Sequence, residues 1–285
     1  MKGKMSTQTI VYGGLAVVLF VLLFALTFQG WTGEKSVKQP KVVAFGDSVL
    51  GLVRDETSVT SLLQDRLGVE VFNAGFGGTC IAKNADNLQL SYPKNCLTMV
   101  GLTEAVLAED FGIQQSLQWR ESNMQYFPEV VDALEEVDFM QVEVVLIQQG
   151  INDYHAGTPL ENPENLMDEY TVAGALRSSV ETLRRVNPRL RIVLITPTYG
   201  WYAETGQTCE EADFGGGVLE DYVNVQLRVS EELGVEVIDV YHDFYPHEKW
   251  EDKDLYTWDG VHPNEMGREK LAARIAEVLV QERTE

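Results

Sequence analysis

The sequence predicts an α/β domain, a three-layer α/β/α sandwich with a parallel central sheet, preceded by one N-terminal transmembrane helix. Three observations predict this arrangement. Short runs rich in Val, Ile and Phe recur along the chain, and stretches with apolar residues at helical spacing separate them. A charge-free apolar run lies near the N-terminus. Strands that alternate with helices form βαβ units with right-handed crossovers, so helices cover both faces of a parallel sheet.

The apolar N-terminal run is predicted to anchor the chain in a membrane. Residues 10–28 contain no charge over nineteen positions. This is close to the roughly 20 apolar residues that span a bilayer, and longer than the roughly 7–15 of a signal-peptide core. We therefore divide the chain into a short tail, a signal-anchor helix, a linker and a globular domain, at residues 1–9, 10–29, 30–40 and 41–285.

The globular domain is expected to lie outside the cell. Lysines are nearly balanced on the two sides of the span, so the expected orientation rests on the short tail that precedes it. The expected location is the cell membrane, with a single pass and an extracellular domain. A cleaved signal peptide is the alternative, and it places the domain outside as well.

Apolar runs and helical periodicity define the expected elements of the domain. Pro188 and Gly234 follow two of the helical patterns, as is typical of helix ends. Residues 77–139 are the least regular stretch, with helical patches at 102–107 and 128–134, and we expect an insertion over the functional face. The predicted strands are 42–45, 69–72, 142–147, 191–195 and 235–240; the predicted helices are 58–67, 166–186, 219–233 and 265–280.

The composition excludes several classes of function. A net charge of −22 argues against a nucleic-acid partner, which needs a basic face, and mildly against a polyanionic substrate. The three cysteines, Cys80, Cys96 and Cys209, are too few for a disulfide framework, although a bridge between the first two remains open. Their spacing matches no zinc pattern, and a structural role for Cys80 is favoured over a nucleophilic one.

Four polar or glycine-rich loops are the candidate functional segments. In an open parallel sheet such loops gather at the carboxyl ends of the strands. Each loop alone is ordinary, because the same residues serve as helix caps and turns. The loops are Gly46-Asp47-Ser48 after the first predicted strand, residues 73–79 with three glycines after the second, Gly150-Ile151-Asn152-Asp153 after the third, and Asp259-Gly260-Val261-His262 before the last helix.

Together these loops contain the groups that acyl transfer requires. Ser48 lies at a strand-to-helix turn, where its hydroxyl is exposed and its N–H is near a helix start, which suits a nucleophile. Asp259 and His262 can share a hydrogen bond that fixes the imidazole as a base. The amide of Asn152 can donate to an oxyanion without carrying charge.

The remaining histidines are expected to have other roles. His155, His242 and His247 lack a setting comparable to that of His262. A metal site at His242 and His247 is an alternative, but their spacing fits no familiar ligand pattern. No metal is therefore expected, and no cofactor is expected either, because a serine, histidine and aspartate set needs none.

The order of the four blocks resembles the SGNH hydrolase superfamily, also called GDSL-type esterases, from about Lys41 to the end of the chain. The resemblance implies a flavodoxin-like α/β/α fold and a serine esterase or lipase-like activity. By position, it implies that Ser48 is the nucleophile, His262 the base and Asp259 its orienting partner. The implied oxyanion donors are the N–H groups of Ser48 and of Gly78, with Gly75 the weaker choice, and the side chain of Asn152.

Two positions depart from the family pattern. Val49 stands where the leucine of the GDSL name would be, and Thr79 stands where an aspartate is frequent. The second departure leaves the choice between Gly78 and Gly75 less sharp.

The predicted function is hydrolysis of a carboxylic ester through an acyl-Ser48 intermediate, with a lipid or an acylated envelope glycan as substrate. One alternative is an O-acyltransferase that acts on cell-envelope polysaccharide. Another, from a different class, is a catalytically inactive surface-binding domain, which the complete set of polar residues disfavours.

Overall fold

Five parallel strands form the centre of the protein, whose computed structural model describes residues 39–84, 95–117 and 128–281. Neighbouring strands pair in the order β2-β1-β3-β4-β7, each pair parallel. The predicted parallel sheet is thus confirmed. The strands are β1 (Val42–Gly46), β2 (Val71–Gly75), β3 (Val144–Gln148), β4 (Arg191–Ile195) and β7 (Glu236–Ile238).

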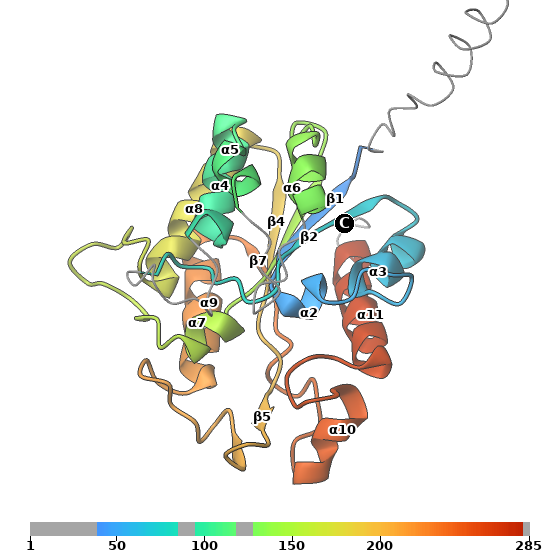
Figure 1. Ribbon diagram of the computed structural model, residues 1–285, viewed down its shortest axis with the longest axis vertical. Coiled ribbons are helices and arrows are strands. Elements are labelled where there is room, and N and C mark those ends of the chain that lie inside the picture. Colours follow the sequence, from blue (N-terminus) through green and yellow to red (C-terminus); the bar gives the residue numbers. More distant parts are fainter. Residues whose placement is uncertain (1–38, 85–94, 118–127, 282–285) are drawn as a thin grey trace, which may run out of the picture. The chain divides into compact units, whose positions relative to one another are not determined.

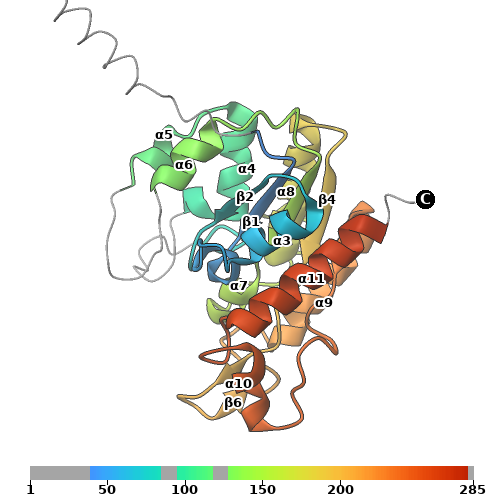
Figure 2. The same ribbon diagram turned by 90° about the vertical axis from the view of Figure 1, so that its right-hand side faces the viewer.

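Helices cover both faces of the sheet. On one face α4 (Met99–Ala108) packs against α8 (Val172–Val186), which packs against α9 (Leu219–Leu233). On the other face α3 (Val59–Leu67) packs against α11 (Glu265–Gln281), and the two views show both layers (Figures 1 and 2). Because both faces are covered, every residue of β1 and of β3 is buried, which explains their continuous apolar sequence.

Several element boundaries differ from the prediction. β2 runs over 71–75 instead of 69–72, and β7 covers only 236–238 of the predicted 235–240. α8 begins at Val172 and not at residue 166, because the Thr171 side chain caps it by accepting the N–H of Gly174 at 3.2 Å. A small antiparallel hairpin of β5 (Trp201–Tyr202) and β6 (Gln207–Thr208) was not predicted.

The described part of 77–139 is a crossover and not an insertion over the functional face. α4 lies in the helical layer beside α8 and connects β2 to β3 across β1. The short helices α5 (Gly112–Gln115) and α6 (Pro128–Glu135) contact each other, and α6 also contacts β2. The helical patches predicted at 102–107 and 128–134 belong to α4 and α6 of this crossover.

The predicted tail and transmembrane helix lie outside the described residues, as does the linker up to residue 38. Within the ranges that the structure does describe, no helix combines the length and apolar character needed to cross a bilayer.

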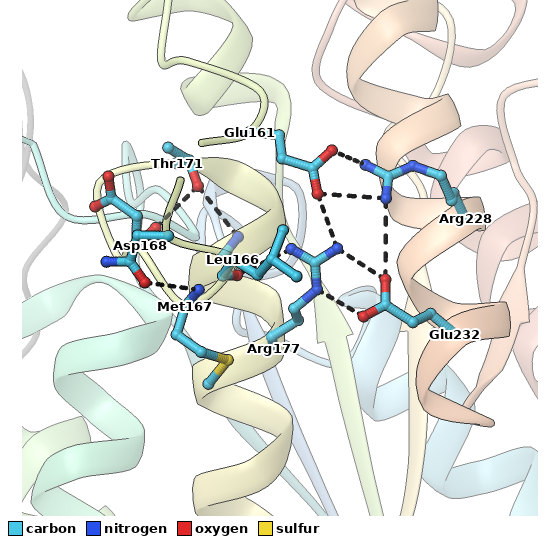
Figure 3. Close-up of polar contacts among 10 residues, drawn as sticks. Glu161, Leu166, Met167, Asp168, Thr171, Arg177, Arg228 and Glu232 are labelled. Carbon is cyan, nitrogen blue, oxygen red and sulfur yellow. Dashed lines mark hydrogen bonds and ion pairs between the residues drawn. The ribbon is translucent and has the colours of Figure 1, made fainter. Parts of the chain in front are cut away.

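A buried arginine holds the long loop between α7 (Ile151–His155) and α8. The side chain of Arg177 on α8 is only 5% exposed and donates to Glu232 on α9 at 2.9 and 2.8 Å. It also donates to Glu161 and to the main-chain oxygen of Leu166 in the loop, each at 2.9 Å (Figure 3). Arg228 closes the network by donating to Glu161 at 2.7 Å.

Replacing Arg177 by methionine should destabilise the protein far more than the same change at Arg228. Removing the cation from a buried ion-pair network leaves its acidic partners uncompensated, so we expect a loss of about 2–4 kcal/mol. Arg228 is 47% exposed, and Arg228→Met should cost about 1 kcal/mol or less. Urea unfolding measures both values. Equal losses for the two variants would contradict this assignment.

Candidate active site

The candidate loops meet because three strands end at the same level. Gly46 at the end of β1 pairs with Gly75 of β2 on one side and with Gln148 of β3 on the other. The short helix α2 (Ser48–Gly51) starts directly after β1, and α7 starts three residues after β3. The polar residues that follow these strands therefore lie at one edge of the sheet.

Three of the predicted residues form a continuous chain of hydrogen bonds. The Nδ1 atom of His262 lies 2.6 Å from Oδ2 of Asp259, and its Nε2 atom lies 2.9 Å from Oγ of Ser48. An ionised carboxylate can only accept, so Nδ1 carries the hydrogen and Nε2 is free to accept from the Ser48 hydroxyl. Ser48 and His262 are 214 positions apart in the sequence.

Local hydrogen bonds hold the Asp259 carboxylate in place. Its Oδ1 atom accepts the N–H of Val261 at 3.0 Å and the N–H of His262 at 2.8 Å. Gly260, which follows Asp259, has φ of +95°, and a Cβ there would lie 2.2 Å from the main-chain oxygen of Trp201. Only glycine fits this position, because both the backbone angle and the close approach exclude a side chain.

The electrostatics of the pair favour a charged His262. Burial opposes the charge on the imidazole, but the hydrogen bond and the charge of Asp259, with a smaller contribution from Asp47, raise the pKa of His262 above its ordinary value. Burial likewise opposes ionisation of Asp259, yet the hydrogen bonds from His262 and from the backbone hold the pKa of this carboxyl far below its ordinary value. The pair thus stabilises an imidazolium.

The glycine-rich loop is tied to both neighbouring strands through Thr79. The buried Thr79 hydroxyl donates to the Phe76 oxygen at 2.8 Å, lies 3.2 Å from the Gly46 oxygen, and accepts from Gln149 at 2.9 Å. The side chain of Asn152 donates to the main-chain oxygen of Thr79 at 3.1 Å. A threonine therefore performs a joining role at the position where the family often has aspartate.

The structure distinguishes between the two candidate glycines. The N–H of Gly75 donates to the side chain of Asn73 at 3.0 Å and is not available to a ligand. Gly78 has φ of +75°, and its N–H finds no acceptor in the described part of the chain. Gly78 is therefore the better candidate donor of the two.

Asp47 and Asp153, which adjoin Ser48 and Asn152 in the sequence, are fully buried, and the sequence motifs predicted no separate role for either. Asp47 accepts the N–H of Val49 at 2.9 Å through Oδ1, whereas its buried Oδ2 has no partner among the described residues. Burial, with a smaller contribution from Asp153, raises the pKa of Asp47 to about 7. Asp153 accepts from Ile81 and Ala82 at 2.8 and 3.0 Å, and burial raises its pKa to about 7.

The expectation that no other histidine has a setting like that of His262 is wrong. Asp239 accepts the N–H of His242 at 3.2 Å and contacts its Nδ1 atom at 2.7 Å, the same geometry as in the Asp259–His262 pair. The Nε2 atom of His242, however, faces the Glu220 carboxylate at 3.7 Å, and it has no hydrogen bond to a hydroxyl group of the described residues. In this chain the three-residue spacing of Asp and His thus forms the same local pair at both positions.

The other two histidines pack against aromatic rings. The Nε2 atom of His155 lies 3.0 Å from the hydroxyl of Tyr202, and burial, together with His262, lowers the pKa of His155 to about 4. His247 stacks on Tyr199 with ring centroids 4.2 Å apart. Within the described ranges, no group of three or more His, Cys, Asp or Glu residues could hold a metal ion.

Cys80 and Cys209 are buried and have structural roles. Cys80 is a buried free thiol, so the open alternative of a bridge to Cys96 is not formed. Burial and the nearby Asp153 and Asp47 raise the pKa of Cys80, which keeps it protonated and a poor nucleophile. The buried sulfur of Cys209 accepts the N–H of Gly200 at 3.3 Å.

The chain is similar to known proteins in sequence and in fold. Residues 44–270 match the GDSL-like lipase/acylhydrolase family. A Chitinophaga pinensis structure described as a possible lipase has a TM-score of 0.58 at 19% identity, over 87% of this chain and 100% of that one. A carbohydrate acetylesterase from Sinorhizobium meliloti has a TM-score of 0.51 at 14% identity, over 86% and 99%. No curated protein sequence matches the chain.

Replacing Asp47 by asparagine should make stability less sensitive to rising pH. The folded pKa of about 7 exceeds the ordinary value of 3.8, so the folded protein binds the proton more tightly than the unfolded chain. Stability is therefore full at low pH and is lost as pH rises between these two values. Asparagine keeps an oxygen for the Val49 N–H but does not ionise.

Melting temperatures at about pH 5 and about pH 8 measure this effect. Wild type should lose at least about 3 °C more than Asp47→Asn between them, the shift that about 1 kcal/mol produces in a domain of this size. Asp65→Asn, at an exposed position on α3, is the control and should follow wild type. Parallel curves for Asp47→Asn and wild type would disprove the assignment.

Proposed function

Since this chain belongs to the GDSL-like lipase/acylhydrolase family and is an ester-hydrolysing enzyme, we propose that it cleaves a carboxylic ester through an acyl-Ser48 intermediate. One observation carries the proposal: Ser48 Oγ lies 2.9 Å from His262 Nε2, while Asp259 holds Nδ1 of the same ring at 2.6 Å. A nucleophile, a base and an orienting carboxylate in this geometry are the requirements of serine-dependent acyl transfer.

In the first half of the reaction the acyl group moves to the enzyme. Nε2 of His262 takes the proton of Ser48 as Oγ attacks the ester carbonyl carbon, and the carbonyl oxygen becomes an oxyanion. Asp259 stabilises the imidazolium that forms. His262 then gives its proton to the leaving alcohol oxygen, the bond between that oxygen and the carbonyl carbon breaks, and an ester of Ser48 remains.

In the second half water takes the place of the alcohol. His262 accepts a proton from water as its oxygen attacks the acyl carbon, and the new oxyanion forms in the same position. The bond to Ser48 Oγ breaks, Oγ recovers the proton from His262, and a carboxylic acid leaves.

Three donors are proposed to bind the oxyanion: the N–H groups of Ser48 and Gly78 and the side-chain amide of Asn152. In the described part of the chain, neither N–H group has a main-chain acceptor. The Asn152 amide donates one hydrogen to the Thr79 oxygen, and its second hydrogen can donate to a ligand. Donors that need no reorganisation stabilise the oxyanion most effectively.

The proposed substrate is a lipid or an acylated envelope glycan, and the proposed location is the outer face of the cell membrane. The apolar run at residues 10–28 supports an anchor, and the net charge of −22 favours substrates that are not polyanions. The fold shared with a carbohydrate acetylesterase is consistent with an acylated glycan. Transfer of the acyl group to a sugar instead of water uses the same intermediate.

Ser48→Ala should abolish ester cleavage. Without the nucleophilic oxygen no acyl-enzyme can form, so kcat/KM for p-nitrophenyl acetate should fall by about 10⁴-fold or more. Release of p-nitrophenol by the full chain in detergent gives the rate, and adding a glycan acceptor separates hydrolysis from transfer by product analysis. Equal rates for wild type and Ser48→Ala would exclude this mechanism.

Asp259→Asn should slow the reaction and change its pH dependence. The base must be neutral, so activity rises as pH increases through the His262 pKa. Because Asp259 raises that pKa, its loss should move the rise toward lower pH. The rate should fall by about 10³–10⁴-fold, since asparagine no longer favours the active tautomer.

A matched control exists in the second Asp–His pair. Asp239→Asn removes a carboxylate with the same local geometry that does not face Ser48. Its kcat/KM against pH should coincide with that of wild type. If instead both substitutions shift the curve equally, Asp259 has no special part in catalysis.

A further inference from the structure

An exposed tryptophan lies against the proposed catalytic base. The Trp258 side chain is 48% exposed, and its ring centroid lies 5.9 Å from that of His262, with 28° between the planes. Single exposed apolar residues are ordinary on protein surfaces. The position of this one, immediately before Asp259 and beside the His262 ring, is the unusual feature.

The backbone of Trp258 is held firmly although its ring is half exposed. Its N–H donates to the His262 oxygen at 3.1 Å, and Thr257 forms an antiparallel bridge with Pro263. The Thr257 hydroxyl accepts the N–H of Gly260 at 3.0 Å, which closes the loop. The ring is thus presented to solvent from a fixed position, so little conformational entropy is lost when a ligand contacts it.

The reaction geometry determines which part of the substrate this ring can contact. His262 gives its proton to the leaving oxygen, so the alcohol of the ester must lie against the imidazole during acylation. The proposed oxyanion donors Gly78 and Asn152 belong to loops after β2 and β3, and they take the carbonyl oxygen. A side chain stacked beside His262 therefore lies on the alcohol side.

The charge around this loop restricts the alcohol further. From Lys249 to Met266 the chain has five acidic residues and two lysines, and Lys253 pairs with Asp254. An alcohol with a phosphate or carboxylate group would meet repulsion here. A neutral alcohol with an apolar ring face fits both the aromatic surface and the charge.

We propose that Trp258 is a specificity-determining residue that binds the alcohol part of the ester and selects neutral ring alcohols, such as a pyranose, over short acyclic ones. The inference rests on the proposed function and narrows its substrate to acylated neutral glycans. A sugar lays its C–H groups on the indole face, and the contact excludes water from both surfaces.

Phe214 provides a matched control. Its side chain is 44% exposed, but its ring lies 5.2 Å from that of His155 on α7, the helix that also carries Asn152. It is therefore an exposed aromatic residue that packs on His155, and among the described residues no ring contact joins it to His262.

The test compares two acetyl esters that differ only in the alcohol, ethyl acetate and a mono-O-acetylated methyl glucoside. The full chain in detergent is assayed by acid release as wild type, Trp258→Ala, Trp258→Phe and Phe214→Ala. Trp258→Ala should lower the ratio of kcat/KM for the glucoside ester to that for ethyl acetate about tenfold, mainly through KM, as loss of one aromatic contact predicts. Trp258→Phe should keep most of the wild-type ratio, and Phe214→Ala all of it.

Three outcomes overturn the inference. If Trp258→Ala lowers kcat for both esters alike and moves the pH profile, the ring only positions His262. If the ratio is unchanged, or changes equally in Phe214→Ala, Trp258 does not select the alcohol. If folded wild type releases acid from neither ester nor from p-nitrophenyl acetate, the proposed function fails, and the inference fails with it.

Discussion

The site depends on one constraint, which is that β1, β2 and β3 end at the same level of the sheet. Gly46 pairs with Gly75 and Gln148, so the loops that follow all start at one edge of the sheet. Thr79 then joins them, since its hydroxyl lies near the oxygen of Gly46 and accepts from Gln149. A shift of one strand by one residue would turn its side chains to the other face and separate these groups.

Electrostatics at this edge combine one ionised carboxylate with two buried ones. Hydrogen bonds from His262 and from the backbone keep Asp259 charged, and this charge stabilises the imidazolium of His262. Asp47 and Asp153 are fully buried, and their raised pKa values show the cost of charging them there. The enzyme thus has carboxyl groups with strongly shifted pKa values close to its nucleophile, as functional sites often do.

The sequence pattern predicted an element correctly where the residues of that element determine its structure. The apolar runs located every strand of the central sheet to within a few residues, and Gly234 marked the end of α9. The prediction failed where capping or tertiary packing determines the boundaries or the role of an element. The start of α8 depends on the Thr171 cap, the role of α4 depends on its contact with α8, and the β5–β6 hairpin is too short to leave a periodic signal.

The two Asp–His pairs separate what the sequence determines from what the tertiary structure determines. The spacing of three residues lets Asp239–His242 and Asp259–His262 form the same hydrogen bonds, because each pair lies within one short loop. The sequence by itself therefore determined the residue types, the strands and the local geometry of each pair. His242 faces Glu220. Only the tertiary structure, with α11 packed against α3, decided that His262 faces Ser48, because that contact joins residues 214 positions apart.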